Sequence, residues 1–273
     1  VKKLWKKMNS WVYAGFQKTY QELNISFDKI YYESKTYKLG KDLIKLGLKK
    51  KVFYQKKDNS IWIDLTSEGL DKKLVLRKDG TSVYITQDLG TAVLRQKKYN
   101  LDQIIYVVAS EQDYHFKVLF LILKKLGFKW ASTLFHLSYG LVNLPEGRMK
   151  SREGQVVEGD DIIEEMKKKA QEIMSQSTKQ IITPEKEKKE IINTVGLGAL
   201  KFFLLSTNPN KNITFNPQES ISFEGYTGPF IQYTHARIYN IIQKEKKLEK
   251  ISKLDFNINF NEEENKLIKE LLN

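Results

Sequence analysis

The middle of the chain alternates between strand-like and helix-like hydrophobic patterns, and this rhythm constrains the fold more than any other feature. Residues 104–108 form a continuous apolar run, which is typical of a strand buried on both faces of a parallel sheet. Apolar side chains at helical spacing follow through 116–126, and another strand is predicted over 134–141. A strand over 82–86 and a helix over 89–97 are predicted before this unit. The pattern predicts one half of a doubly wound α/β fold, whose ligand edge lies where its strands end.

The region before residue 77 follows a different pattern. Apolar side chains at helical spacing predict a helix over 5–23. Short apolar runs then alternate with polar turns through 27–76, which predicts a small mixed module of helix and strand. Its expected strands lie at 52–54, 61–65 and 74–76.

The last third of the chain is predicted to be all-helical. Asp160 and Asp161 favour a helix start, because acidic side chains complement the helix dipole, and this helix is expected to run to about Met174. The polar stretch 175–190, which contains Pro184, predicts a linker or an exposed hairpin. Three further helices are expected over 191–205, 230–248 and 262–272.

The composition limits the kind of partner that the protein binds. Lys and Arg together number 46 against 33 Asp and Glu, which gives a net charge of +13. This surplus favours a polyanion, with nucleic acid the leading candidate, although a lysine-rich genome explains the charge equally well. The absence of cysteine excludes disulfides and thiolate zinc sites. The sequence contains no apolar run long enough to span a bilayer and does not begin like a signal peptide.

Three polar clusters are expected at the carboxyl ends of the strands, where open α/β sheets bind ligands. They occupy residues 79–88, 109–115 and 136–140. In the first cluster, Tyr84 and Asp88 would bring a phenol and a carboxylate to the sheet edge. Ordinary structure explains such residues too, as a strand tyrosine with an acidic residue at a helix start, or as a capping turn with a structural histidine. The clusters alone leave both interpretations open.

A glycine-flanked basic loop follows the third cluster, and residues 147–154 read Gly-Arg-Met-Lys-Ser-Arg-Glu-Gly. Glycines permit unusual backbone angles, and the fixed positive charges are suited to neutralising a polyphosphate in a phosphoryl-type transition state. Taken alone, such a loop in a basic protein is more often a solvated surface segment.

Taken in order, these segments resemble class I aminoacyl-tRNA synthetases, and most closely the arginyl-tRNA synthetase family. The resemblance covers nearly the whole chain and is most specific over 79–160 and 224–240. The segments that carry it are 79–88 (DGTSVYITQD), 106–116 (YVVASEQDYHF), 136–140 (HLSYG), 149–154 (MKSREG) and 225–237 (GYTGPFIQYTHAR).

The resemblance implies an arginine pocket formed by Tyr84, Asp88 and Gln112. A guanidinium presents a planar fork of donors, which a carboxylate beside an aromatic wall holds well. The resemblance also implies an ATP site, in which Glu111 takes the acidic position that faces the adenosine ribose. The remaining implied ATP contacts are His115, His136, Gly140, Leu141 and Val142.

The basic loop corresponds to a signature whose usual class I form is Lys-Met-Ser-Lys-Ser. Here it reads Arg148-Met149-Lys150-Ser151-Arg152, and Ser151 replaces the usual second lysine. These five residues are the implied catalytic loop. Charge at the pyrophosphate would come from Arg148, Lys150 or Arg152, and the sequence does not rank them.

The other class I signature, His-x-Gly-His, is missing, because His115, His136 and His235 are the only histidines. The family carries that motif N-terminal to the segment present here. The chain, which starts with Val1, is therefore expected to be a fragment that is inactive alone. The implied domains are a connective insertion (1–77), the second half of a Rossmann-type catalytic domain (78–160), a helical connector (161–190) and the truncated start of an all-helical anticodon-binding domain (191–273).

The resemblance places tRNA-facing residues on the helix predicted after Gly228 and Pro229. An ordinary bundle helix with a tyrosine stripe is the alternative explanation of the same pattern. The implied tRNA-binding residues are Tyr226, Gln232, Tyr233, His235 and Arg237.

The activity implied by the resemblance is the condensation of arginine with ATP to arginyl adenylate, followed by transfer of the arginyl group to tRNA(Arg). ATP would act as a substrate with Mg²⁺, without zinc or an organic prosthetic group. The protein would be a cytoplasmic monomer that does not bind membranes. A synthetase for glutamate, glutamine or cysteine is disfavoured, since Asp88 would repel an acidic substrate and no thiolate can bind zinc. A basic RNA-binding module without catalysis is the remaining alternative.

Overall fold

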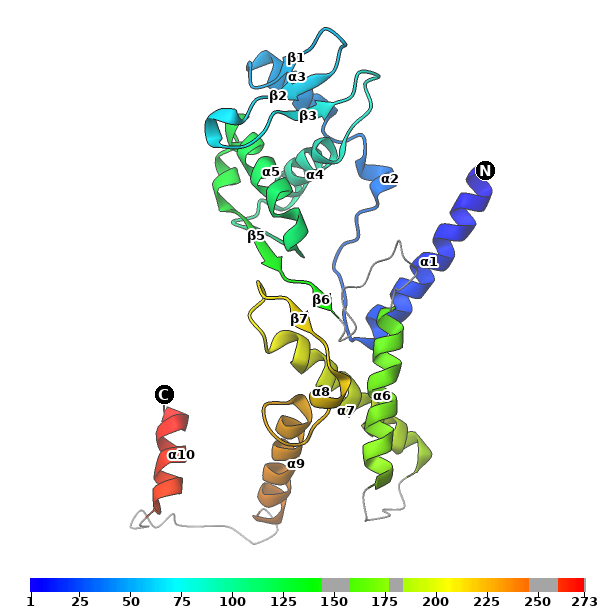
Figure 1. Ribbon diagram of the computed structural model, residues 1–273, viewed down its shortest axis with the longest axis vertical. Coiled ribbons are helices and arrows are strands. Elements are labelled where there is room, and N and C mark those ends of the chain that lie inside the picture. Colours follow the sequence, from blue (N-terminus) through cyan, green and yellow to red (C-terminus); the bar gives the residue numbers. More distant parts are fainter. Residues whose placement is uncertain (144–157, 177–183, 246–259, 273) are drawn as a thin grey trace.

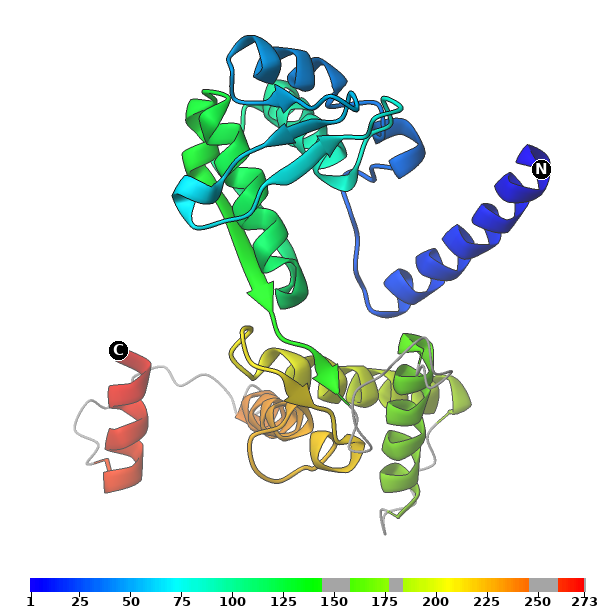
Figure 2. The ribbon, with the colours of Figure 1, turned by 45° about the horizontal axis from the view of Figure 1, so that its top comes forward.

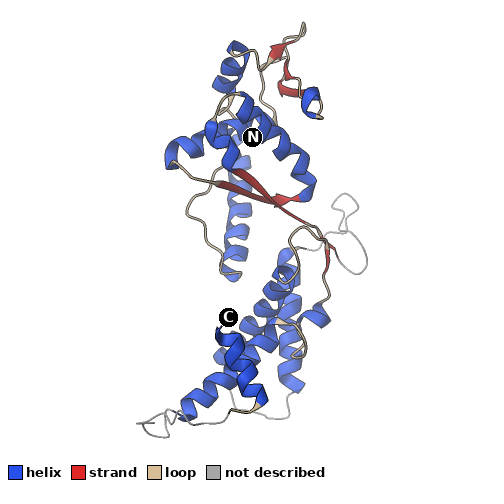
Figure 3. Ribbon diagram, turned by 90° about the vertical axis from the view of Figure 1, so that its left-hand side faces the viewer, coloured by secondary structure: helices blue, strands red, loops and turns tan. Residues whose placement is uncertain are grey.

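The computed structural model describes residues 1–143, 158–176, 184–245 and 260–272. Two packed regions lie one above the other in Figure 1. Each has its own set of buried apolar side chains: the first core runs from Ile44 to Leu134, and the second core from Ile163 to Ile221. Figure 3 shows that strands occur mainly in the upper region and that helices make up most of the lower one.

A small antiparallel sheet forms one side of the first core. Its strands follow the order β1 (Tyr54–Gln55), β2 (Ile61–Ile63) and β3 (Lys73–Leu76). The middle strand buries Ile61 and Ile63 and leaves Trp62 half-buried, which is the alternation that strand geometry dictates. The predicted strands in this module are confirmed, with β1 shifted toward residue 55. Two short helices precede the sheet, α2 (Glu33–Thr36) and α3 (Lys41–Lys49).

A parallel strand pair forms the other side of the first core. β4 (Ile104–Ala109) runs beside β5 (Leu134–Tyr139), with Ile104 opposite Leu134 and Ala109 opposite Tyr139. α4 (Tyr84–Tyr99) and α5 (Asp113–Lys125) pack against each other, and α5 also contacts β5. Short 3-10 turns occur at η1 (Thr66–Glu68), η2 (Ser110–Gln112) and η3 (Lys129–Thr133).

One face of the parallel pair is bare. Ile105 and Val107 on β4 are 52% and 62% exposed, and Phe135 and Leu137 on β5 are 51% and 38% exposed. The sequence predicts burial of β4 on both faces, and within the described ranges this holds only for the face of Ile104. We call the exposed face, formed by Ile105, Val107, Phe135 and Leu137, the bare sheet face.

The predicted strand over 82–86 is wrong. Only Ser82 pairs, through an isolated bridge to Leu76, and α4 already begins at Tyr84. The Val83 backbone N–H donates to the Thr86 hydroxyl over 3.3 Å, which caps the first turn of the helix. The alternation of Val83 and Ile85 resembles a strand, but it belongs to a helix entry.

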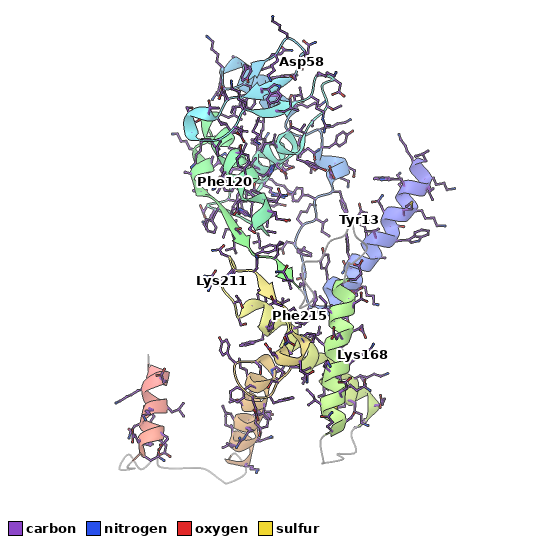
Figure 4. The ribbon with its side chains drawn as sticks, viewed as in Figure 1. Tyr13, Asp58, Phe120, Lys168, Lys211 and Phe215 are labelled. Carbon is purple, nitrogen blue, oxygen red and sulfur yellow. The ribbon has the colours of Figure 1, made fainter. Side chains whose placement is uncertain are left out.

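The second core is helical, as predicted. Its principal helices are α6 (Gly159–Gln176), α7 (Glu185–Leu205), α8 (Pro217–Ser220) and α9 (Gly228–Glu245). A short parallel pair joins β6 (Val142–Asn143) to β7 (Ile213–Thr214). Figure 4 shows Phe215, which is 1% exposed, among these helices. The stretch 175–190, predicted as a linker or hairpin, instead contains the start of α7 at Glu185.

The predicted N-terminal helix is confirmed as α1 (Lys2–Glu22), although it buries no residue. Its last turn is attached to the second core: the Thr19 hydroxyl donates to Asp160 over 2.7 Å, and Glu22 forms an ion pair with Lys167. The rest of α1 extends away from α6 (Figures 1 and 2). The predicted helix at 262–272 is confirmed as α10 (Glu262–Leu272). Within the described ranges, no helix is both long and apolar enough to cross a membrane.

Candidate active site

The carboxyl end of β4 leads through η2 into the first turn of α5, β5 contacts both η2 and α5, and α4 packs against α5. β4 ends at Ala109, the η2 turn follows, and α5 begins at Asp113. The second polar cluster therefore lies at the end of a parallel strand, as predicted. The first cluster reaches the same region from the start of α4, because its predicted strand does not form.

Asp88 and His115 make the closest polar contact between α4 and α5. The Asp88 Oδ2 atom lies 2.7 Å from His115 Nε2. The Asp88 side chain is 46% exposed and the His115 side chain 25% exposed, so solvent still reaches this carboxylate. The sequence assigns Asp88 to arginine and His115 to ATP, whereas the structure joins the two side chains.

His136 on β5 is held from three sides. Its Nε2 atom lies 2.9 Å from the Val108 carbonyl oxygen, which can only accept, so the ring donates there. The Nδ1 atom lies 3.3 Å from a carboxylate oxygen of Asp113, and the ring packs against Phe116 with centroids 4.3 Å apart. The His136 side chain is only 10% exposed. Through its contacts with Val108 and Phe116, this histidine ties β5 to β4 and to α5.

Three packed aromatic rings lie beneath these polar groups, and we call Tyr106, Phe116 and Phe120 the aromatic floor. The Tyr106 ring packs against Phe116 at 4.9 Å and Phe120 at 5.7 Å between centroids. Burial raises the pKa of the Tyr106 phenol, the charge of Asp88 adds to this, and Arg95 opposes it. The phenol oxygen has no hydrogen-bond partner among the described residues. The floor makes the environment of Asp88 partly apolar, which strengthens charge-assisted contacts.

Tyr84 and Gln112 are accessible at the same edge. Tyr84 is the first residue of α4, one turn before Asp88, and is 75% exposed. Gln112 ends the η2 turn and is also exposed. Within the described part of the chain, no hydrogen bond joins Tyr84, Asp88 and Gln112. Their convergence on one guanidinium remains a prediction.

The predicted ATP-binding segment 140–142 is occupied by contacts within the chain. The Gly140 N–H donates to the Pro209 carbonyl over 2.6 Å, and the Leu141 N–H donates to the Asn212 side chain over 2.7 Å. A side chain at Gly140 would overlap the backbone of Lys211, so only glycine fits there. Glu111 is exposed at the η2 turn. The predicted catalytic loop, Arg148 to Arg152, lies outside the described residues.

The residues predicted to face tRNA divide into two groups. Gln232 is half-buried, donates to the Thr194 carbonyl over 2.9 Å and holds α9 against α7. The others are exposed on or before α9: Tyr226 is 81% exposed, and the Arg237 guanidinium lies 5.5 Å from the Tyr233 ring centroid. His235 is likewise exposed and stacks with Tyr239.

Sequence reasoning missed the pairing of Asp88 with His115 and of Asp113 with His136. A usable signal was present, because each pair joins a residue at a helix start to a residue near the end of a strand or the start of the next helix. Such neighbours meet at the sheet edge in a parallel fold.

Comparison with known proteins identifies the family. The family model for the catalytic domain of class I tRNA synthetases (R) matches residues 1–217. The chain is 52% identical over 242 residues to the arginine–tRNA ligase of Flavobacterium psychrophilum, which covers 88% of this chain and 40% of that protein. It is 57% identical over 244 residues to the arginine–tRNA ligase of Phocaeicola vulgatus, covering 89% of this chain and 40% of that protein. The chain thus spans about 40% of the length of these curated relatives.

Solved structures agree with this result. The arginyl-tRNA synthetase of Thermus thermophilus has a TM-score of 0.70 at 25% identity, over 84% of this chain and 44% of that chain. The arginyl-tRNA synthetase of Plasmodium falciparum has a TM-score of 0.75 at 23% identity, over 89% of this chain and 41% of that chain, which supports the mixed α/β fold. The resemblance found in the motifs is confirmed, and the chain belongs to the class I tRNA synthetases of the arginine (R) family.

Proposed function

We propose that the chain is part of an arginine–tRNA ligase, which activates arginine with ATP and transfers it to tRNA. The observation that carries the proposal is the family match over residues 1–217. The accessible carboxylate of Asp88, at the edge where parallel strands end, supports arginine as the amino acid.

Arginine recognition would rest on charge and planarity. One oxygen of Asp88 accepts from His115, and the other would accept from the guanidinium. Tyr84 lies one helical turn earlier on α4 and would form the aromatic wall, while Gln112 would approach from the η2 turn. A carboxylate discriminates against neutral side chains, because a hydrogen bond between charged partners is roughly twice as strong as one between neutral groups.

The chemistry would proceed in two displacements. In the first, a carboxylate oxygen of arginine attacks the α-phosphorus of ATP, and the bond to the leaving pyrophosphate breaks. In the second, a ribose hydroxyl at the tRNA 3′ end attacks the arginyl carbonyl carbon, and AMP leaves. The residues of this chain would act by binding, orientation and charge, with the basic loop 148–152 neutralising the phosphates.

Mg²⁺ would arrive with ATP and neutralise phosphate charge. This ion keeps several waters and binds mainly through substrate phosphates and one or two carboxylates, so it needs no cage of protein ligands. Among the described residues, no group of three or more His, Cys, Asp and Glu side chains could hold a metal ion. Glu111, exposed beside the pocket, would face the ribose of the nucleotide.

RNA binding would use the positive charge and the exposed rings of α9. The net charge of +13 favours a polyanion, and Tyr233 with Arg237 offers a stacking and cationic surface. We further propose that residues 191–273 begin the domain that contacts the tRNA anticodon arm, and that the complete protein acts as a cytoplasmic monomer.

The decisive experiment is charging of tRNA by a full-length ligase that contains this segment. Labelled arginine should become acid-precipitable with tRNA and ATP, whereas citrulline, which has the same shape without the charge, should not. Binding of tRNA without any charging of arginine would contradict the proposal and favour the alternative of an RNA-binding module. A parallel binding assay with the 273-residue chain separates RNA affinity from catalysis.

A further inference from the structure

The contact between Asp88 and His115 points to a role for His115, which is not among the proposed arginine-binding residues Tyr84, Asp88 and Gln112. His115 Nε2 lies 2.7 Å from Asp88 Oδ2. Within the described ranges, His115 is the side chain that hydrogen-bonds Asp88. No hydrogen bond to the other carboxylate oxygen, Oδ1, occurs among the described residues, and the side chain remains 46% exposed.

We propose that His115 is a positioning residue for the amino acid substrate: it fixes the orientation of Asp88, so that Oδ1 is presented to the guanidinium. This inference rests on the proposed function, and it moves His115 from the ATP side of the site to the arginine side. A free aspartate rotates about two side-chain bonds, and ordering it on binding reduces affinity. A carboxylate already held through one oxygen avoids that cost.

Both Asp88 and His115 lie next to residues that are buried in the first core. The His115 ring packs edge-on against Phe116 with centroids 5.6 Å apart, and Phe116 is buried at 8% exposure. On the other side, α4 is anchored one residue after Asp88 by Leu89, which is fully buried, and by the Thr86 hydroxyl, which donates to the Val75 carbonyl. The geometry of the pair is therefore set by the first core.

The proposed role requires a donor that leaves the negative charge of Asp88 in place. A neutral imidazole has one N–H, and its use on Asp88 leaves the carboxylate charge in place for the guanidinium. A permanent cation at residue 115 would instead cancel that charge and compete with arginine. Arg95, whose charge acts on the Tyr106 phenol, is directed to the rings of Tyr31 and Tyr106, at 5.2 and 5.9 Å from their centroids.

The first test examines the contact in the 273-residue chain by NMR. The chain has three histidines, so the ring resonances of His115 are assigned with a His115→Gln variant. Asp88→Asn should shift the His115 ring resonances and leave those of His235, on α9, unchanged. Unchanged His115 resonances would overturn the inference without reference to catalysis.

The second test measures steady-state kinetics in a full-length ligase that contains this segment. His115→Leu should raise the KM for arginine about tenfold, since a hydrogen bond to a charged group is lost, and should change the KM for ATP less than twofold. His115→Gln keeps a neutral N–H donor of similar reach and should restore the arginine KM to within about threefold. A permanent cation in His115→Lys should not restore it.

The matched control is Tyr114→Phe. Tyr114 lies in the same turn of α5. Its hydroxyl donates to the Asp71 carboxylate over 2.8 Å and accepts from the Asp71 backbone N–H over 3.0 Å, so this variant removes two hydrogen bonds that do not involve Asp88. It should leave the arginine KM unchanged. Equal effects of His115→Leu on both substrates, or an unchanged arginine KM, would refute the positioning role while arginine charging by the wild type stands. A wild-type protein that charges no arginine would refute the proposed function as well.

Discussion

The close approach of two backbones positions α4, and with it Tyr84 and Asp88. Gly40 has a φ of +113°, and a Cβ there would overlap the Thr86 carbonyl oxygen. One turn later on α4, a Cβ at Gly90 would overlap the backbone of Leu39. Backbone atoms cannot rotate away as side chains do, so alanine at either position must push the 39–40 segment off the helix. We predict that both substitutions destabilise the first core.

The expected loss of stability has two parts: the cost of a left-handed backbone for alanine, and the cost of the steric overlap. Gly69 has a φ of +73° with nothing within 4 Å of its Cβ position, so Gly69→Ala measures the left-handed backbone alone, about 1–2 kcal/mol. Gly90→Ala has no left-handed backbone to strain. Its overlap costs about 3 kcal/mol through overpacking, and the better helix propensity of alanine offsets about 1 kcal/mol of this, so the net loss is about 2 kcal/mol. Gly40→Ala combines both costs and should lose about 4 kcal/mol. That loss corresponds to a Tm roughly 10 °C lower.

Urea titration of the wild type and of the Gly69→Ala, Gly90→Ala and Gly40→Ala variants measures these losses of stability. Intrinsic fluorescence reports the first core, because Trp62 and Trp130 are partly buried there, whereas Trp5 and Trp11 on α1 are 50% and 61% exposed already. The reasoning is refuted if Gly90→Ala does not destabilise the protein, or if Gly40→Ala costs no more than Gly69→Ala. Either result would mean that the backbones of α4 and the 39–40 segment do not touch.

Three further predictions concern binding and pH. Asp88→Asn in the full-length ligase should raise the arginine KM by more than about tenfold and leave the ATP KM unchanged, as judged by initial rates; comparable losses for both substrates would contradict the assignment. Hydrogen bonds from the Thr66 side chain and backbone, with Lys72, lower the pKa of Asp64 to about 2. Because the folded value lies below the ordinary 3.8, the stabilisation by Asp64 is present above pH 4 and is lost as the pH falls toward 2; Asp64→Asn should flatten this part of the stability profile in urea titrations. The affinity of the chain for tRNA should fall steeply between 50 and about 200 mM salt in filter-binding assays, and salt-independent binding would separate the net charge from RNA recognition.

Local patterns predicted most of the helices and the parallel strands. The spacing of apolar residues through 5–23 and 116–126 is a property of neighbouring residues, so α1 and α5 could be read directly. The segment 82–86 could not, because its alternation fits a strand as well as a helix entry. The choice depends on the Thr86 side chain, which caps the turn and bonds the Val75 carbonyl across the fold.

The gathering of polar residues after β4 was predictable from the sequence, but the contacts between these residues were not. The ends of parallel strands indicated where polar residues would gather. The partner of Asp88 depends on how α4 packs against α5, which no local pattern encodes. Likewise, Gln232 reads as one of several polar residues along α9, and only the packing of α9 on α7 directs its amide to the Thr194 carbonyl.

The bare sheet face has a consequence for the colloidal behaviour of the chain. Its four apolar side chains belong to a pair of strands with no further strand beside it in the described ranges, and such surfaces attract one another in water. The net charge of +13 opposes that attraction by mutual repulsion. The screening length of this repulsion is about 10 Å at 0.1 M salt and about 3 Å at 1 M salt. We therefore expect the molecules to stay apart in dilute buffer and to associate through this face in concentrated salt.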